Sequence, residues 1–289
     1  MRNIKTILIK FLVVLLFISI IIPGSYGHMK SDINNSENYY ALLFSVGEYY
    51  KNPEQNRFSM FRAVDQLESC LLSSSNWKEE NIHIVKGEKA TGIRFIREMM
   101  WLINKEKKND FTLVYITTHG SPLKYKEIPL DLPPFDESDG ADEILVMYHG
   151  FEYPFSFITD DMINFLLNLM QSKGVCLVVD SCFSGGFNDH SMQALDTNKI
   201  TKFSNDFIED LFGDRRVVLM SSEEDTVSYG SVFSFNLIDG LNGEADKNGN
   251  NDGINSAEEA FYYALNQNNY YGGQHPTILD LYDGQLPLT

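Results

Sequence analysis

The chain has little positive charge and little cysteine. Its 289 residues contain 23 Lys and Arg against 40 Asp and Glu, which gives a formal net charge of −17 at pH 7. An excess of this size repels nucleic acid and anionic membrane surfaces, so we expect neither as a partner. Three cysteines are too few, and odd in number, for the disulfide framework of a small secreted protein. At least one thiol therefore remains unpaired.

Long hydrophobic runs are also absent, except for one at the N-terminus. That run covers residues 11–22, follows three basic residues, and precedes a Ser-Tyr-Gly site that ends at Gly27. This order predicts a secretory signal peptide over residues 1–27. An uncleaved anchor is the alternative, because residues 7–22 fall only slightly short of a membrane span. Either way the remainder is predicted to be exported, as a secreted or cell-surface protein, without stable membrane association unless the segment stays uncleaved.

After a short linker at residues 28–38, strand-like and helix-like segments alternate through residues 39–289, and no repeat is evident. Continuous apolar runs separated by helices predict a mostly parallel sheet covered by helices on both faces. We therefore expect one α/β domain with three layers. The predicted strands cover residues 39–46, 81–87, 111–120, 174–182 and 215–222. The predicted helices cover residues 58–74, 91–105, 159–172 and 256–267.

Three details of this pattern can be checked against a structure. Thr159 is expected to cap the helix that follows it. In the helix at 91–105, four apolar residues recur at helical spacing and predict one apolar face. The acidic, proline-containing stretch 125–143 is expected to be a surface excursion. The four apolar residues are Ile93, Ile96, Met100 and Ile103.

Two predicted strands end in residues that can carry chemistry. One ends with His119-Gly120, and the other ends with Asp180-Ser181-Cys182. Ligands of open parallel sheets bind at the carboxyl ends of the strands, so neighbouring strands would bring His119 and Cys182 to one edge. An imidazole lowers the pKa of a nearby thiol and accepts its proton. Gly120 lets a backbone N–H approach a developing oxyanion, and the N–H of Cys182 can supply a second donor.

The remaining cysteines and one further histidine are rivals for these roles. Cys176 lies in mid-strand among Val and Leu, and Cys70 lies within a helical apolar pattern, so both are predicted to be core thiols. His149 also precedes a glycine after a strand-like segment. We rank it below His119, because that segment follows the acidic stretch.

The motifs "YITTHG" (115–120) and "DSCFSGG" (180–186) resemble the His-Gly and Asp-Ser-Cys-x-Ser-Gly signatures of the caspase-like cysteine peptidases. This clan includes caspases, metacaspases, legumains and gingipains; the local match is best to metacaspases, and legumain-like exported proteases share the signal peptide. The resemblance implies a caspase-hemoglobinase-like fold with Cys182 as nucleophile and His119 as general base. It also implies an oxyanion hole at Gly120 and Cys182, a protein or peptide substrate, and no cofactor for the chemistry.

The resemblance also suggests a substrate preference. In metacaspases the acid two residues before the nucleophile helps to hold a basic P1 side chain, and Asp180 stands there. Thr117 occupies the matching place before His119, and Asp65 is a further candidate for substrate binding. A partly desolvated carboxylate binds guanidinium or ammonium well. Phe183 departs from the metacaspase pattern, and legumain-like Asn specificity or transpeptidation stays open.

Residues 243–261 concentrate oxygen donors just before a helix. Their spacing approximates an EF-hand calcium loop, with a neutral first ligand. The alternative is an ordinary polar turn in which Ser256 caps the next helix. If calcium binds but the dyad is inert, the chain would be a catalytically silent, calcium-dependent binding module. The predicted ligands are Asp246, Asn248, Asn250, Asp252 and Glu259.

Overall fold

The structure is a computed structural model of the chain. It describes residues 37–125, 128–135, 137, 139–153, 156–183, 203, 205–208, 210–224, 231–268 and 276–289. All of them belong to a compact unit that spans Ser36–Thr289. The predicted signal peptide at residues 1–27 and most of the linker lie outside the described residues. Within the described part, no helix combines the length and the apolar character that a membrane crossing requires.

A sheet of eight strands forms the centre of the unit. Five strands run parallel, and β10 pairs antiparallel with β9 at one edge. Two short strands, β6 and β7, extend the sheet antiparallel beyond the end of β3. The parallel strands, in spatial order, are β9 (Arg216–Glu224), β8 (Gly174–Phe183), β3 (Phe111–Pro122), β1 (Tyr39–Ser45) and β2 (Ile82–Lys86). The others are β10 (Thr277–Asp280), β6 (Glu143–Val146) and β7 (Phe157–Thr159), and a separate hairpin joins β4 (Lys124–Tyr125) to β5 (Ile128–Pro129).

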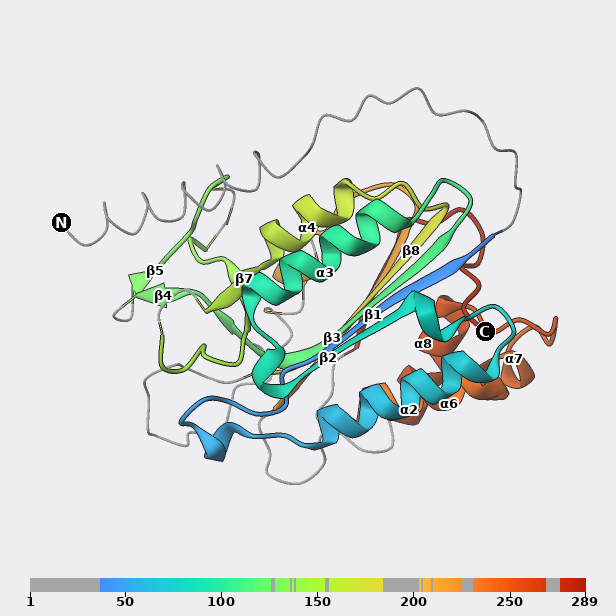
Figure 1. The fold of residues 1–289 in the computed structure, drawn as a ribbon, viewed down its shortest axis with the longest axis horizontal. Helices are drawn as coiled ribbons and strands as arrows, with labels where there is room; N and C mark the ends of the chain where they lie inside the picture. The colour runs from blue at the N-terminus through green and yellow to red at the C-terminus, as the bar shows by residue number, and fades with distance from the viewer. Residues whose placement is uncertain are drawn as a thin grey trace. The chain divides into compact units, whose positions relative to one another are not determined.

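Helices cover both faces of the sheet (Figure 1). On one face lie α3 (Gly92–Lys105) and α4 (Asp160–Asn168), and on the other lie α2 (Ser59–Ser73), α6 (Val232–Asp239) and α8 (Ala257–Asn268). The predicted three-layer α/β sandwich with a mostly parallel sheet is therefore confirmed. Short helical turns complete the fold: Pro53–Gln55, Glu79–Asn81, Gly87–Lys89, the π-helix Gly240–Glu244, and α7 (Ala245–Asn248).

The strands are apolar at almost every position because each face of the sheet has its own core. In β1, Leu42 and Phe44 pack into the core under α3 and α4, whereas Leu43 packs into the core under α2 and α6. Helix ends also follow the sequence as expected. The Thr159 side chain accepts a hydrogen bond from the N–H of Met162 at 3.1 Å, which confirms it as the cap of α4.

Two expectations about the surface are confirmed only in part. The fully buried residues of α3 are Phe95, Met99 and Leu102. Three of the four expected residues, Ile96, Met100 and Ile103, are partly buried and pack against the same core, whereas Ile93 is 75% exposed. Apolar residues thus line two adjacent stripes of this helix, and the stripe that faces the sheet is the more deeply buried. The stretch 125–143 is also not a surface excursion throughout, because its last residue, Glu143, is buried where it begins β6.

Candidate active site

The pairing of β3 with β8 brings the two predicted chemical residues together. These strands run parallel, and the Cα partners include Thr117 with Asp180 and His119 with Cys182. Neighbouring strands lie about 4.8 Å apart, so residues 63 positions apart in sequence become direct neighbours. The Cys182 side chain lies outside the described residues. The strand does not end at His119-Gly120 as expected, because β6 pairs with β3 and carries it on to Pro122.

The surroundings of His119 select one tautomer. Its Nε2 lies 2.8 Å from the backbone carbonyl oxygen of Gln55. A carbonyl can only accept, so Nε2 carries the hydrogen, and Nδ1 is the basic nitrogen of the neutral ring. The imidazole stacks on Tyr49 at 5.0 Å between ring centroids and meets the edge of Phe151 at 6.0 Å. Sequence reasoning missed the Gln55 contact, because a main-chain carbonyl has no residue-type signature.

Gly120 has a packing reason to be glycine. A Cβ at this position would lie 2.5 Å from Cζ of Phe203, which is closer than any van der Waals contact allows. Phe203 belongs to the core beneath α3 and α4. Packing against the Phe203 ring is therefore one reason for glycine at this position. The role of the Gly120 amide in an oxyanion hole stays a prediction.

A row of polar side chains crosses the sheet two residues before the His119–Cys182 pair. We call Ser45, Thr117, Asp180 and Ser221 the polar row; they are register neighbours on β1, β3, β8 and β9. All four are buried. Residues two apart on a strand share a face, so the polar row lies on the same face as the pair. Its three hydroxyl oxygens have no hydrogen-bond partner among the described residues, which is uncommon for buried hydroxyl groups.

Asp180 provides the charge of the polar row. Its carboxylate accepts a hydrogen bond from the Ser234 hydroxyl, which in turn lies 2.6 Å from the hydroxyl of Tyr115. Burial raises the pKa of Asp180 to about 6, against the lowering effect of the Ser234 hydrogen bond. At neutral pH the group is therefore mostly a buried anion. A ligand cation would relieve the cost of that burial.

Asp65, the third predicted substrate-binding residue, lies apart from the polar row. It is on the exposed face of α2, and its carboxylate forms an ion pair with Lys86 at 2.5 Å. Lys86 ends β2, which is separated from β3 by β1. Its role in binding substrate stays a prediction.

The rival thiols have the environment of core residues. Cys70 and Cys176 are both buried and free. Burial raises the pKa of Cys70 to about 12 and the pKa of Cys176 further still. Thiols with raised pKa values are poor nucleophiles, because only the thiolate attacks. The expectation that both are core thiols is confirmed.

The rival histidine, His149, lies in the turn after β6. Its ring contacts three tyrosines, Tyr50, Tyr148 and Tyr153, at centroid distances of 5.1, 4.8 and 5.6 Å. It has no register partner on β8, unlike His119.

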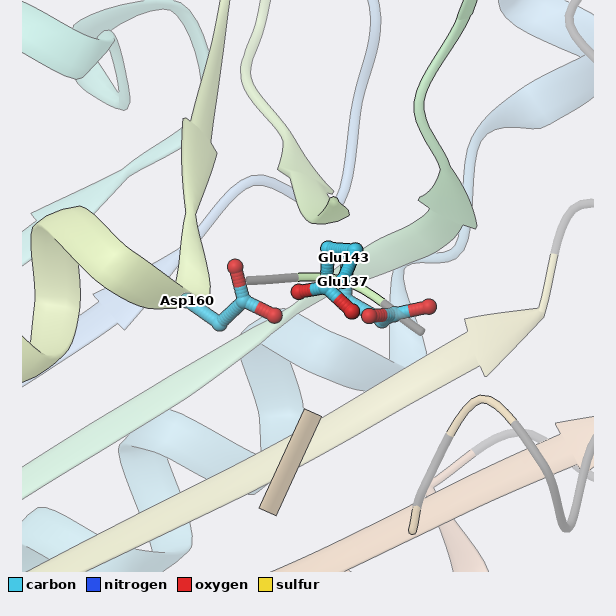
Figure 2. A group of neighbouring side chains, drawn as sticks. All are labelled: Glu137, Glu143 and Asp160. Atoms are coloured by element: carbon cyan, nitrogen blue, oxygen red, sulfur yellow. The ribbon is translucent and has the colours of Figure 1, made fainter. Parts of the chain in front are cut away.

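Three carboxylates gather at the start of α4, where sequence reasoning predicted no site. Ligand oxygens of Glu137, Glu143 and Asp160 all lie within 4.8 Å of one another, and Figure 2 shows the three side chains converging. Burial and the neighbouring acids raise the pKa of Glu143 to about 10 and raise the pKa of Asp160 well above its ordinary value. Oε2 of Glu143 and Oδ2 of Asp160 are buried and have no hydrogen-bond partner in the described part of the chain. Such oxygens suit a hard divalent cation such as calcium, which prefers carboxylate ligands.

The predicted calcium loop at 246–259 uses its oxygens differently. Glu259 and Ser256 form a reciprocal cap: the Ser256 oxygen accepts from the Glu259 N–H at 3.1 Å, and Glu259 Oε2 accepts from the Ser256 N–H at 3.3 Å. Asp246 and Asp252 accept from backbone N–H groups within the loop. Asn250 likewise accepts from the backbone, and Asn248 donates to the Glu244 carbonyl. The Ser256-capped polar turn is thus present, and calcium at this loop stays a prediction.

Comparison with known proteins adds the family. The sequence profile described as "Metacaspase, peptidase C14 domain" matches residues 25–191, which is more than half of the chain. The chain belongs to the metacaspase family. Among curated proteins, Metacaspase-1B of Neurospora crassa is 28% identical over 176 residues, or 56% of this chain and 37% of that protein. Metacaspase-1A of Aspergillus oryzae is 26% identical over 181 residues, or 58% of this chain and 39% of that protein.

The matches define how far the metacaspase likeness reaches. The aligned part spans less than two fifths of each curated relative. His119, Cys182 and the three-carboxylate group lie inside the matched range of this metacaspase, whereas the loop at 246–259 lies outside it. Protein GSU0716 from Geobacter sulfurreducens has a similar structure, with a TM-score of 0.53, 15% identity, and coverage of 84% of this chain and 92% of that one. This likeness concerns the fold alone, and with the family it bears out the implied caspase-like α/β fold.

Proposed function

We propose that this protein is an exported cysteine endopeptidase that cleaves peptides after Arg or Lys. The observation that carries the proposal is the β3–β8 register, which pairs His119 with Cys182 and, two residues earlier on the same face, Thr117 with Asp180. One edge of the sheet thus offers a thiol, a base and a buried anion within the reach of a single substrate residue.

The chemistry follows from these positions. Nδ1 of His119 takes the proton of the Cys182 thiol, and the thiolate attacks the scissile carbonyl carbon. The backbone N–H groups of Gly120 and Cys182 stabilise the negative oxygen of the tetrahedral intermediate. His119 then gives its proton to the leaving amine, and a thioester remains. Water, deprotonated by His119, hydrolyses the thioester and restores the thiol.

Basic P1 specificity rests on the polar row. A guanidinium or ammonium group that enters beside Asp180 would neutralise its buried charge. The hydroxyls of Ser45, Thr117 and Ser221, which have no partner among the described residues, would accept the remaining N–H hydrogens. A neutral asparagine side chain would leave the Asp180 charge unpaired. This difference favours Arg and Lys over legumain-like Asn specificity.

Replacement Asp180→Asn is expected to weaken cleavage after Arg and Lys by roughly 1–3 kcal/mol in kcat/KM, because it removes a charge-assisted hydrogen bond. An otherwise identical peptide with Asn at P1 serves as the matched control and should lose less. In the wild type, protonation of Asp180 removes its charge as the pH falls through about 6. The Arg-to-Asn ratio of kcat/KM should therefore fall below pH 6 and be independent of pH in Asp180→Asn. Equal losses on all peptides would mean that Asp180 supports the strand without reading P1.

Transpeptidation remains the alternative outcome of the same thioester. Product analysis in the presence of an added amine nucleophile separates the two reactions, because hydrolysis yields only the free acid. An acyl-amine product that dominates at low amine concentration would replace the endopeptidase proposal by a transpeptidase.

We propose calcium as a bound ion, held by Glu137, Glu143 and Asp160. The support is the convergence of their oxygens and the two buried oxygens that have no other described partner. Calcium takes six to eight oxygen ligands, and outside the cytoplasm even a weak site is filled. The ion would neutralise the cluster and fix the start of α4 beside β6. It takes no part in the proposed chemistry at Cys182.

Millimolar calcium is expected to raise the melting temperature of the wild type. At a concentration 100 times Kd, binding stabilises by about 2.7 kcal/mol, or roughly 5–10 °C for a domain of this size. The double variant Glu143→Gln, Asp160→Asn should lose the shift. The matched variant Asp252→Asn, Glu259→Gln, in the loop at 246–259, should keep it. The reverse pattern would place the ion in that loop. A wild-type melting temperature that changes with neither calcium nor chelator would contradict both sites.

A further inference from the structure

On the side of β3 that faces β1, the main-chain N–H of His119 donates to a side chain and not to a strand carbonyl. In the parallel ladder, the Val46 N–H donates to the Thr117 carbonyl at 3.0 Å, and the next bond would run from the His119 N–H to the Val46 carbonyl. That carbonyl instead accepts from the N–H of Glu48 at 2.6 Å, because the chain turns after β1. The His119 N–H donates to the Tyr49 hydroxyl at 2.9 Å. The Tyr49 hydroxyl thus accepts the hydrogen bond that the Val46 carbonyl would accept in a continued ladder.

The Tyr49 hydroxyl donates one hydrogen bond and accepts another. The Thr118 hydroxyl donates to the Val146 carbonyl, which can only accept. Its single hydrogen is then committed, so at the 3.0 Å contact between the two hydroxyls Tyr49 must donate to Thr118. The Tyr49 oxygen keeps its lone pairs for the His119 N–H. Buried bonds that run in one direction strengthen one another, so β3, β6 and Tyr49 are tied to the main chain of the base.

Tyr49 also contacts the imidazole itself. The two rings stack at 5.0 Å with an angle of 29° between their planes, and Phe151 packs against the edge of Tyr49 at 5.0 Å. An aromatic face attracts a cation, so this stacking stabilises the imidazolium that forms when His119 takes the thiol proton. Tyr49 is itself held in place, because its N–H donates to Oδ1 of Asn56 at 2.9 Å, next to the Gln55 carbonyl that bonds Nε2.

We propose that Tyr49 is a positioning residue for the peptidase reaction. Its hydroxyl fixes the main chain of His119, and its ring fixes the imidazole plane and stabilises the protonated ring. The inference rests on the proposed His119–Cys182 dyad. The adjacent Tyr50 offers a matched control, because it has the same side chain on the same loop but contacts Tyr148, His149 and Tyr153.

Tyr49→Phe keeps the ring and removes the hydroxyl. It is expected to lower kcat by roughly 10- to 100-fold with KM little changed, since a displacement of about 1 Å costs up to 10²-fold. Thr118→Val, which removes the acceptor of the Tyr49 proton, should lower kcat similarly, and the double variant should be no worse than the stronger single one. Tyr50→Phe should retain wild-type kcat. Additive losses, or equal kcat in Tyr49→Phe and Tyr50→Phe, would overturn the proposal.

The ring is tested by the alkylation of Cys182 with iodoacetamide, followed against pH by mass spectrometry. Tyr49→Leu removes the stacked ring, so a less stabilised imidazolium supports the thiolate less, and the pH midpoint of alkylation should rise. Tyr49→Phe should keep the wild-type midpoint. An unchanged midpoint in a folded Tyr49→Leu would contradict the role of the ring, and if that variant does not fold, Tyr49→Phe still tests the hydroxyl. A wrong assignment of the dyad itself would be detected separately, because Cys182→Ala would then retain turnover.

Discussion

Replacement Cys182→Ala is expected to abolish cleavage of Arg-P1 peptides and to leave the melting temperature close to that of the wild type. Alanine has no group that can attack a carbonyl or carry the acyl intermediate. A base or a hydrogen-bond donor cannot take over this role of the thiol. Residue 182 lies at the carboxyl end of β8 beside His119, not in mid-strand. The measurements are kcat/KM with fluorogenic peptides and thermal unfolding of the same samples.

Cys176→Ala is the matched control. Its sulfur is fully buried in the core beneath α2, α6 and α8, so its removal leaves a small cavity. We expect a loss of roughly 1–2 kcal/mol of stability and nearly full activity. If Cys182→Ala retained most of the activity, or if Cys176→Ala lost it while still folded, the nucleophile would be misassigned. An active-site-directed thiol electrophile that labels the wild type at Cys182 also excludes a catalytically silent binding module.

Replacement His119→Ala is expected to lower kcat/KM by at least about 10²-fold, the usual contribution of a positioned general base. The register places the imidazole beside Cys182 on the β3 side, and its Nε2 is held by the Gln55 carbonyl. Without it the thiol keeps its proton near neutral pH, and the leaving amine has no acid. The rate should therefore rise with pH in the variant, as the thiol ionises unaided.

His149→Ala is the corresponding control. Its loss disturbs an aromatic contact with Tyr50 and Tyr148, so the melting temperature should fall while kcat/KM changes much less. A His149 variant that matches or exceeds the loss in His119→Ala would reverse the ranking of the two His-Gly pairs.

The central strands could be predicted because their sequences satisfy two cores at once. Leu42 and Leu43 point to opposite faces of β1, and both are buried, which leaves an uninterrupted apolar run in the sequence. In the sequence, the same runs are followed directly by His119 and Cys182, although β3 itself continues to Pro122. Their register is a property of the pairing between strands, and no residue of either strand encodes it alone.

Other features leave a weak trace or none. Helix α6 was not predicted from the sequence. It has only eight residues, most of them apolar, so no polar face reveals the helical periodicity. Glu143 and Asp160 were not predicted as a site, because acidic residues in a polar stretch are usually solvated. Their burial depends on the pairing of β6 with β3, which the sequence does not reveal. The Gln55 carbonyl acts through the main chain, which every residue possesses.

If His119 and Cys182 act together as proposed, the parallel pairing of β3 with β8 also determines when the chain becomes able to cleave a peptide. A crossover that includes α4 separates the two strands, so the nascent chain contains His119 long before Cys182 is made. Contacts between segments far apart in sequence form late in folding, after the entropy of closing the intervening loop has been overcome. An unfinished or unfolded chain therefore holds a thiol of ordinary reactivity with no base beside it. On the proposed His119–Cys182 dyad, competence for cleavage arises in the same step as the central sheet and is lost when that sheet opens.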